Sequence, residues 1–132
     1  MQPKEAVAVF VAQRVASEGF GDYTAIGLGE DGQILAGVIY NNFTRASLCM
    51  HVAAVEGKRW LTKAYLRACF EYPFNQLAVR TVIGLVPKKN KQARQFDEHL
   101  GFRLTGCVPD GMPTDDVLIY TMTRKQCHWL RN

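Results

Sequence analysis

The sequence predicts an α+β fold, with a mostly antiparallel sheet that contains one parallel strand pair and is flanked by helices. Three observations predict it. Apolar residues recur at helical spacing in two segments, residues 3–17 and 59–72. Residues 23–40 hold two apolar stretches separated by a short turn, which is typical of an antiparallel hairpin. A buried strand follows the second helix, and such a strand-helix-strand unit implies a parallel pair with a right-handed crossover.

The first helix is expected from Pro3 to Ser17. Proline is suited to the first turn of a helix, where its missing N–H would have no partner, and Gly19 lies just past the end. The segment is therefore expected to be an amphipathic helix. Its apolar face consists of Val7, Phe10, Val11 and Val15.

Three strands are expected next. The first two, Tyr23–Gly29 and Gln33–Tyr40, are joined by a turn over residues 30–32. The pair Asp31-Gly32 in this turn readily takes the positive φ angles that hairpin turns require. A third strand is expected over Arg45–Val55.

The second half of the chain alternates helices and strands. A helix over Arg59–Tyr72 is expected to stop at Pro73, because proline lacks the N–H that a helix interior requires. This helix connects the third strand to a fourth, Arg80–Val86. The remaining elements are expected to be a helix at Lys91–Leu100 and strands at Arg103–Gly106 and Asp116–Thr123. All of the elements are expected to form one domain of residues 1–132.

Composition restricts the class of protein. The chain has 132 residues, of which 48% are hydrophobic, and this is enough to bury a core in one domain. No apolar stretch reaches the ~20 residues of a membrane span and no leader peptide is recognised, so a soluble cytoplasmic protein is expected. The net charge of +4 favours anionic partners such as phosphates, but it does not choose among CoA, nucleic acid and acidic protein. Nucleic acid is the least favoured of these, because the basic residues lack the interleaved aromatic side chains that base stacking requires. Reduced thiols are expected at four scattered cysteines, Cys49, Cys69, Cys107 and Cys127.

The most informative segment covers residues 84–102. It has the pattern of a buried strand, a loop ending at Asn90, a short helix and a Gly101-Phe102 exit. This order, with Asn90, Ala93 three residues later and a terminal Leu-Gly-Phe, resembles the pattern in the second half of the GNAT N-acetyltransferase fold. The resemblance extends over about residues 23–122. It implies a small GNAT protein with a splayed parallel strand pair, a shortened N-terminal region and acetyl-CoA as the acyl donor.

The resemblance implies that the pyrophosphate of acetyl-CoA binds at the start of the second helix, where unpaired N–H groups and the helix dipole attract anions. The residues concerned are Gly57, Lys58, Arg59, Trp60, Leu61 and Thr62. Trp60 and Thr62 stand where family members have small residues, so this loop is a degenerate form of the family motif. Lys58 and Arg59 would supply positive charge there. The alternative is that Trp60 is a core anchor and that both cations are solvated.

The resemblance also implies where the rest of acetyl-CoA lies. The pantetheine arm would pair with the main chain of Val52, Ala53 and Ala54, at the end of the third strand. Asn90 would contact it from the opposite side, and Arg94 would reach the nucleotide end. The alternatives are an ordinary buried strand for the first three residues and a helix cap for Asn90.

The expected reaction is direct attack of an amine on the thioester. A lysine-like amine, with a pKa of about 10.4, needs a base to remove its proton. His51 is the first candidate because it precedes the thioester site and titrates near neutral pH, and Glu56 is the alternative. Tyr120 on the last strand is a candidate acid, and the alternative is that it is an ordinary core tyrosine. Asp97 stands where family members have the tyrosine that protonates the thiolate, and a carboxylate can replace it only if its pKa is strongly raised.

Two functions remain open at this stage. The first is an acetyl-CoA-dependent N-acetyltransferase with an unidentified amine acceptor. The second is a catalytically degenerate protein of the same fold that binds acyl-CoA or a macromolecular partner. One helix precedes the hairpin where family members have more, so the acceptor side is expected to be open, completed by a partner subunit, or suited to a bulky substrate. An uncovered hairpin edge favours a homodimer.

Overall fold

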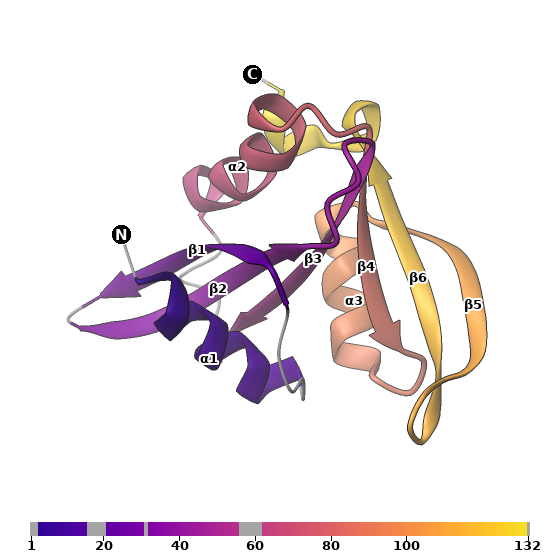
Figure 1. Cartoon of the computed structure of the whole chain (residues 1–132). Coiled ribbons are helices and arrows are strands. Elements are labelled where there is room, and N and C mark those ends of the chain that lie inside the picture. Colours follow the sequence, from indigo (N-terminus) through magenta and orange to yellow (C-terminus); the bar gives the residue numbers. More distant parts are fainter. Residues whose placement is uncertain (1–2, 16–20, 31, 56–61, 132) are drawn as a thin grey trace.

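The described part of the chain forms a six-stranded sheet with helices on both faces (Figure 1). The computed structural model describes residues 3–15, 21–30, 32–55 and 62–131. The helical elements are α1 (Lys4–Val15), α2 (Lys63–Glu71), the π-helical turn η1 (Tyr72–Gln76), α3 (Lys91–Leu100) and the 3-10 turns η2 (Arg124–Gln126) and η3 (His128–Leu130). The strands are β1 (Tyr23–Glu30), β2 (Gln33–Asn41), β3 (Ser47–Ala54), β4 (Thr81–Pro87), β5 (Arg103–Met112) and β6 (Asp115–Thr123). The predicted α+β class is confirmed.

The strand order is β1-β2-β3-β4-β6-β5, and neighbouring strands are antiparallel except for β3 and β4. The parallel register runs only from Ser47 opposite Thr81 to Cys49 opposite Ile83. Beyond this point both strands continue but no longer pair, and they diverge in Figure 1. We call the diverging residues, 50–54 of β3 and 84–87 of β4, the β3–β4 splay. The predicted splayed parallel pair is therefore confirmed.

Different helices cover the two faces of the sheet. Figure 1 shows α1 in front of β2 and α3 behind β4. Helix α1 approaches β2 closely because Gly37 has no side chain: a Cβ there would lie 2.8 Å from Val7 Cγ1 and 2.9 Å from Val11 Cγ2. Helices α2 and α3 enclose the larger core on the other face. Its buried members include Val38, Leu48, Phe70, Phe74, Val82, Leu100, Phe102, Leu118, Tyr120 and Met122.

Helix α3 has the bounds that the sequence predicts because both of its ends are capped. Asn90 Oδ1 accepts a hydrogen bond from Ala93 N at 3.1 Å, which satisfies one of the unpaired N–H groups of the first turn. At the other end Gly101 has a φ of 110°, a left-handed conformation that glycine adopts without steric cost. These two residues fix the ends of α3.

The predicted end of the second helix is right to within one residue, but Pro73 does not end the helical conformation of the chain. Helix α2 ends at Glu71, but the chain continues as η1, in which Leu77 N donates to Tyr72 O at 3.0 Å. Proline cannot donate to the carbonyl four residues before it, which is that of Cys69. Tyr40 Oη supplies the missing donor to Cys69 O at 2.5 Å from across the core. The carbonyl that proline leaves without a helical partner is thus satisfied by tertiary structure.

Strand β5 is longer than predicted, because it runs from Arg103 to Met112 rather than ending at Gly106. Its second half pairs with β6, for example Val108 with Val117. Most of β5 is exposed, so its sequence lacks the alternation of apolar and polar residues that identifies a half-buried strand. The other strand ends lie within two residues of those predicted.

No described helix is both long enough and apolar enough to cross a membrane. All four cysteines are free thiols. Cys107 is exposed, and the other three are buried.

Replacement of Tyr40 by Phe is expected to lower the free energy of unfolding by about 1–3 kcal/mol, because it leaves the Cys69 carbonyl buried without a donor. Tyr72→Phe is the matched control, since within the described part of the chain its hydroxyl bonds only to the half-buried Thr24 Oγ1, at 3.3 Å. Urea unfolding of the two variants measures the difference. Equal losses would show that the bond to Cys69 is not what stabilises η1.

Candidate functional site

The β3–β4 splay is the feature around which the candidate site is built. The last paired residues of the two strands are Cys49 and Ile83. In the splay, β3 keeps its ladder with β2, but the backbone groups that face β4 have no strand partner. Backbone N–H and C=O groups of this kind can pair with an extended ligand, as an added strand would.

The predicted pantetheine residues lie along the β3 side of the splay. Ala53 faces α1 and is buried, whereas Val52 and Ala54 face the main core and are half-buried. The two alanines leave space that larger side chains would fill. The structure therefore brings these residues to the unpaired edge of β3, where their main chain is positioned to bind a ligand.

Asp97 lies over the β4 side of the splay. A Cβ at Gly84, the first residue of β4 beyond the paired segment, would lie 3.0 Å from Asp97 Oδ2. The missing side chain of Gly84 thus makes room for the carboxyl group. Among the residues that the structure describes, none donates a hydrogen bond to this carboxylate.

The surroundings of Asp97 favour its protonated form. Burial and, to a smaller extent, the charge of Glu98 raise the pKa of Asp97 to about 7. The sequence indicates that a proton donor at this position needs a raised pKa, but it does not show the burial that raises it. A glycine in a strand interior often marks the close approach of another group, so Gly84 was the available signal.

Tyr120 is a core residue, which is the alternative to its predicted role as a proton donor. It is fully buried on β6, directly opposite Gly84. Its hydroxyl donates to Glu98 Oε2 at 2.7 Å and accepts from Arg94 Nε at 3.4 Å. Burial, together with Glu98, raises the pKa of Tyr120. Because the hydroxyl proton is already held by Glu98, Asp97 is the better proton donor toward the splay.

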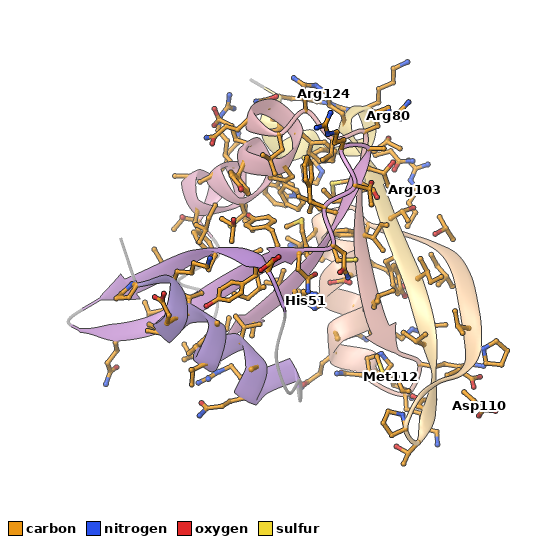
Figure 2. All side chains as sticks on the ribbon, in the orientation of Figure 1. His51, Arg80, Arg103, Asp110, Met112 and Arg124 are labelled. Atoms are coloured by element: carbon orange, nitrogen blue, oxygen red, sulfur yellow. The ribbon has the colours of Figure 1, made fainter. Side chains whose placement is uncertain are left out.

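His51 lies on the opposite face of the sheet from Asp97. It occupies the same face of β3 as Cys49, which pairs with Ile83, whereas Gly84 and Asp97 belong to the other face. Its Nε2 lies 2.9 Å from Asn41 Oδ1, which orients the ring. Burial lowers the pKa of His51 from its usual 6.5, so the neutral imidazole predominates at pH 7. Figure 2 shows His51 near the middle of the molecule.

Arg94 and the loop before α3 form a basic region beyond the end of β4. An open cavity of about 930 Å³ is lined by Lys88, Lys89, Lys91 and Arg94, together with residues 110–116 of the β5–β6 hairpin. Two carboxylates of the hairpin are already engaged: Asp115 Oδ2 accepts from Lys89 N at 2.7 Å and Asp116 Oδ1 from Asp110 N at 2.9 Å. Asp110 lines the same cavity, and the backbone N–H of Lys89, with a smaller effect from the charges of Lys89 and Lys88, lowers the pKa of Asp115. The hairpin carboxylates therefore offset part of the positive charge that this cavity offers to an anion such as a phosphate.

The remaining predicted site residues divide into two groups. Thr62 is the N-cap of α2, and its Oγ1 accepts from Tyr65 N at 3.1 Å. Asn90 caps α3 with its amide oxygen, as described above. The predicted phosphate residues Gly57, Lys58, Arg59, Trp60 and Leu61, and the alternative base Glu56, lie outside the described residues.

The fold is shared with solved acetyltransferase structures. A probable acetyltransferase matches with a TM-score of 0.68 and 21% identity, over 80% of this chain and 63% of its own length. The N-acetyltransferase PseH of Campylobacter jejuni, solved in complex with acetyl coenzyme A, matches with a TM-score of 0.59 and 18% identity, over 79% and 70% of the two chains. A mutant of the spermidine N-acetyltransferase SpeG from Vibrio cholerae matches with a TM-score of 0.69 and 14% identity, over 91% and 73%.

These likenesses establish the fold. The chain spans a little under two thirds of the length of the first of these structures, 63%. No protein-family model and no curated protein sequence matches the chain.

Proposed function

We propose, on the premise that this chain has the GNAT fold of N-acetyltransferases, that it transfers an acetyl group from acetyl-CoA to an amine by direct attack on the thioester. The observation that carries the proposal is the β3–β4 splay, with Asp97 on one face and His51 on the other. A thioester held between the strands would have a proton donor on one side and a proton acceptor on the other. A general base and a general acid placed in this way would accelerate aminolysis.

The described residues fit acetyl-CoA. The unpaired edge of β3 at Val52, Ala53 and Ala54 would pair with the amide groups of the pantetheine arm. Asn90 would contact that arm from the α3 side. Arg94 and the lysines of the basic cavity would bind phosphate oxygens, for which Arg and Lys are the usual partners. The net charge of +4 supports an anionic ligand of this kind.

The proposed reaction moves two protons. The acceptor nitrogen forms a bond to the thioester carbonyl carbon, and His51 takes the proton that the nitrogen loses. A main-chain N–H near Ala53 would stabilise the negative charge that develops on the carbonyl oxygen. The carbon–sulfur bond then breaks, and Asp97 donates its proton to the departing thiolate. Solvent returns both side chains to their starting protonation states.

We also propose that residues 1–132 act as one cytoplasmic domain and that a homodimer forms through a sheet edge. Strand β1 pairs with β2 and, in the described part of the chain, with no other strand. An edge of this kind offers backbone groups to a second chain.

Calorimetric titration with acetyl-CoA tests the proposal, and binding should weaken as salt rises because phosphate contacts contribute to it. A parallel assay measures release of CoA in the presence of amines. Binding with turnover supports the transferase. Binding without turnover for any amine supports the alternative, a catalytically degenerate acyl-CoA-binding protein. Absence of heat and of a thermal shift at millimolar acetyl-CoA contradicts both.

A further inference from the structure

Basic side chains from four separate segments meet at the end of the sheet that lies opposite the splay. Arg80 and Arg124 are the next residues beyond the pair that Thr81 of β4 forms with Thr123 of β6. Figure 2 shows these two arginines together near the top of the molecule, with Arg103 below them. We define the arginine end by its five members, Arg45, Arg80, Arg103, Arg124 and Lys125.

Arg45 joins this group through the loop before β3. Arg80 N donates to Ala46 O at 2.8 Å, so the loop lies beside the start of β4. Thr44 Oγ1 holds the loop in place, because it accepts from Ala46 N at 3.3 Å and from Ser47 N at 3.0 Å. Arg45 itself has a φ of 76°, a left-handed conformation that arginine rarely adopts. Backbone strain of this kind is concentrated at functional positions.

The charges of the arginine end are not neutralised by the described part of the chain. All five side chains are exposed, and no described carboxylate forms an ion pair with any of them. Arg124 Nη1 donates to Phe74 O at 2.7 Å, which uses one of the five donors of the guanidinium. Five like charges at one end of the sheet attract an anionic partner. Because arginine pairs with phosphate and carboxylate alike, charge alone does not identify this partner.

An aromatic cavity adjoins the arginine end. It has a volume of about 580 Å³ and lies between the start of β1, the end of β2 with the loop that follows, and η1. Phe43 connects the cavity to the cations, since it lines the cavity and precedes Arg45 by two residues. It is 51% exposed, and it is the only exposed side chain among the described phenylalanines. The other aromatic residues of the lining are Tyr23, Tyr40 and Tyr72.

The cavity and the cations together suit a nucleic acid better than an acidic polypeptide. A nucleobase has flat faces that stack on aromatic rings, and its edge carries donors and acceptors that Asn42 and Asp22 in the cavity lining can meet. An acidic side chain has no such face, and Asp22 would repel it. Neighbouring strands lie about 4.8 Å apart, so the cations on β3, β4, β6 and β5 follow a line roughly 15 Å long. A line of this length spans several phosphates of one nucleic-acid strand.

We infer that the arginine end binds the phosphates of a single-stranded nucleic acid and that the cavity holds one of its bases against Phe43. The sequence disfavours nucleic acid because no aromatic residues alternate with the basic ones, but the fold brings arginines from distant segments together beside Phe43. The inference goes beyond the proposed function and does not depend on it. The seven residues of β4 separate the arginine end from the far end of the splay by roughly 20 Å.

Fluorescence anisotropy with the full chain and a labelled single strand of about 12 nucleotides, made as RNA and as DNA, tests the inference. At least one of the two strands is expected to bind with a Kd of about 1–100 μM near 0.15 M salt. The logarithm of the binding constant should fall with the logarithm of the salt concentration with a slope of about −3, as about four phosphate contacts give. Saturating acetyl-CoA should leave this Kd unchanged, because the two sites lie at opposite ends of β4.

Four results would overturn the inference. The first is no binding of either strand, and the second is displacement of the strand by acetyl-CoA, which would place it at the splay. The third is equally tight binding of AMP, which would leave the line of arginines without a role. The fourth is equally tight binding of a duplex of the same length or of polyglutamate, neither of which offers an unpaired base to the cavity. Strand binding in a protein that does not bind acetyl-CoA would contradict the proposed function alone.

Three single substitutions locate the surface. Arg80→Gln is expected to raise the Kd of the strand about fivefold and to reduce the magnitude of the salt slope by about 0.7, because it removes one phosphate contact. Phe43→Ala should raise the Kd about tenfold without changing the slope, since stacking releases no counterions. Lys91→Gln is the matched control, because it removes the same charge from the basic cavity at the other end of β4, and it should change the Kd less than about twofold.

Thermal unfolding shows whether the variants are folded. In the described part of the chain the side chains of Arg80 and Phe43 make no hydrogen bond, so the Tm of both variants should match that of the unsubstituted protein. Equal effects of Arg80→Gln and Lys91→Gln on the Kd would contradict the inference, as would an unchanged Kd in Phe43→Ala.

Discussion

Replacement of Asp97 by Asn is expected to lower kcat about 100-fold near pH 6.5, because Asn keeps the shape of the side chain but has no proton to donate to the thiolate. The Kd of acetyl-CoA should be unchanged, since the carboxyl contributes a proton rather than a binding contact. Stopped assays of CoA release over a range of pH measure the effect. An unchanged kcat would remove Asp97 from the reaction.

The pH dependence follows from the raised pKa of Asp97. Only the protonated carboxyl donates a proton, and its pKa is about 7, so kcat of the unsubstituted protein should fall about tenfold per unit above that pH. The descending limb should disappear in Asp97→Asn. Glu98→Gln removes the smaller of the two causes that raise this pKa, and it should move the limb to lower pH.

A stability measurement checks the raised pKa of Asp97 independently of the reaction. The pKa of Asp97 in the folded protein, about 7, lies above its ordinary value of 3.8, so folding favours the protonated form. The stability that this group contributes is therefore complete below pH 3.8 and is lost as pH rises through 7. Asp97→Asn should raise the Tm at pH 8 by more than it does at pH 5. A lower Tm at both values would indicate that the side chain has a packing role instead.

Replacement of His51 by Ala is expected to lower kcat/KM for the acceptor by about 100-fold at pH 7, because general-base catalysis typically contributes a factor of this size or more. The Kd of acetyl-CoA should change little. His99→Ala is the matched control, because His99 lies exposed on α3 and away from the splay. A loss in Kd that equals the loss in rate would assign His51 to binding rather than to proton transfer.

The role of His51 as a base also predicts the acidic limb of the pH–rate profile. Burial lowers the pKa of His51 below 6.5, so the neutral base persists to more acidic pH than an exposed histidine would allow. The unsubstituted protein should show an ascending limb below pH 6.5, and this limb should be lost in His51→Ala. Together, the two side chains predict a bell-shaped profile with its maximum between their pKa values.

Much of the fold could be predicted because local signals agreed with tertiary structure. Helix α3 has its predicted bounds since Asn90 and Gly101 cap it within the segment itself. The continuation through Pro73 could not be predicted, because the donor to the Cys69 carbonyl is Tyr40, which lies 29 residues away. The full length of β5 was missed because an exposed edge strand carries no alternating pattern.

The sequence predicted the strands and the helix that flank the candidate site, but not its electrostatics. The order of motifs indicated the parallel pair and the side chains around it. The pKa of Asp97 depends on its burial against Gly84, and the distance between the two in three dimensions is not a property of either segment alone. The assignment of His51 and Asp97 to opposite faces likewise depends on the register of β3 with β4.

The central claim is that acetyl-CoA binds in the β3–β4 splay with its thioester between Asp97 and His51. A crystal structure of the protein with acetyl-CoA tests it most directly. The predicted result is a pantetheine arm paired with the main chain of residues 52–54 and a thioester sulfur about 3–3.5 Å from an Asp97 oxygen. Acetyl-CoA bound away from the splay, or a thioester beyond the reach of both side chains, would contradict it.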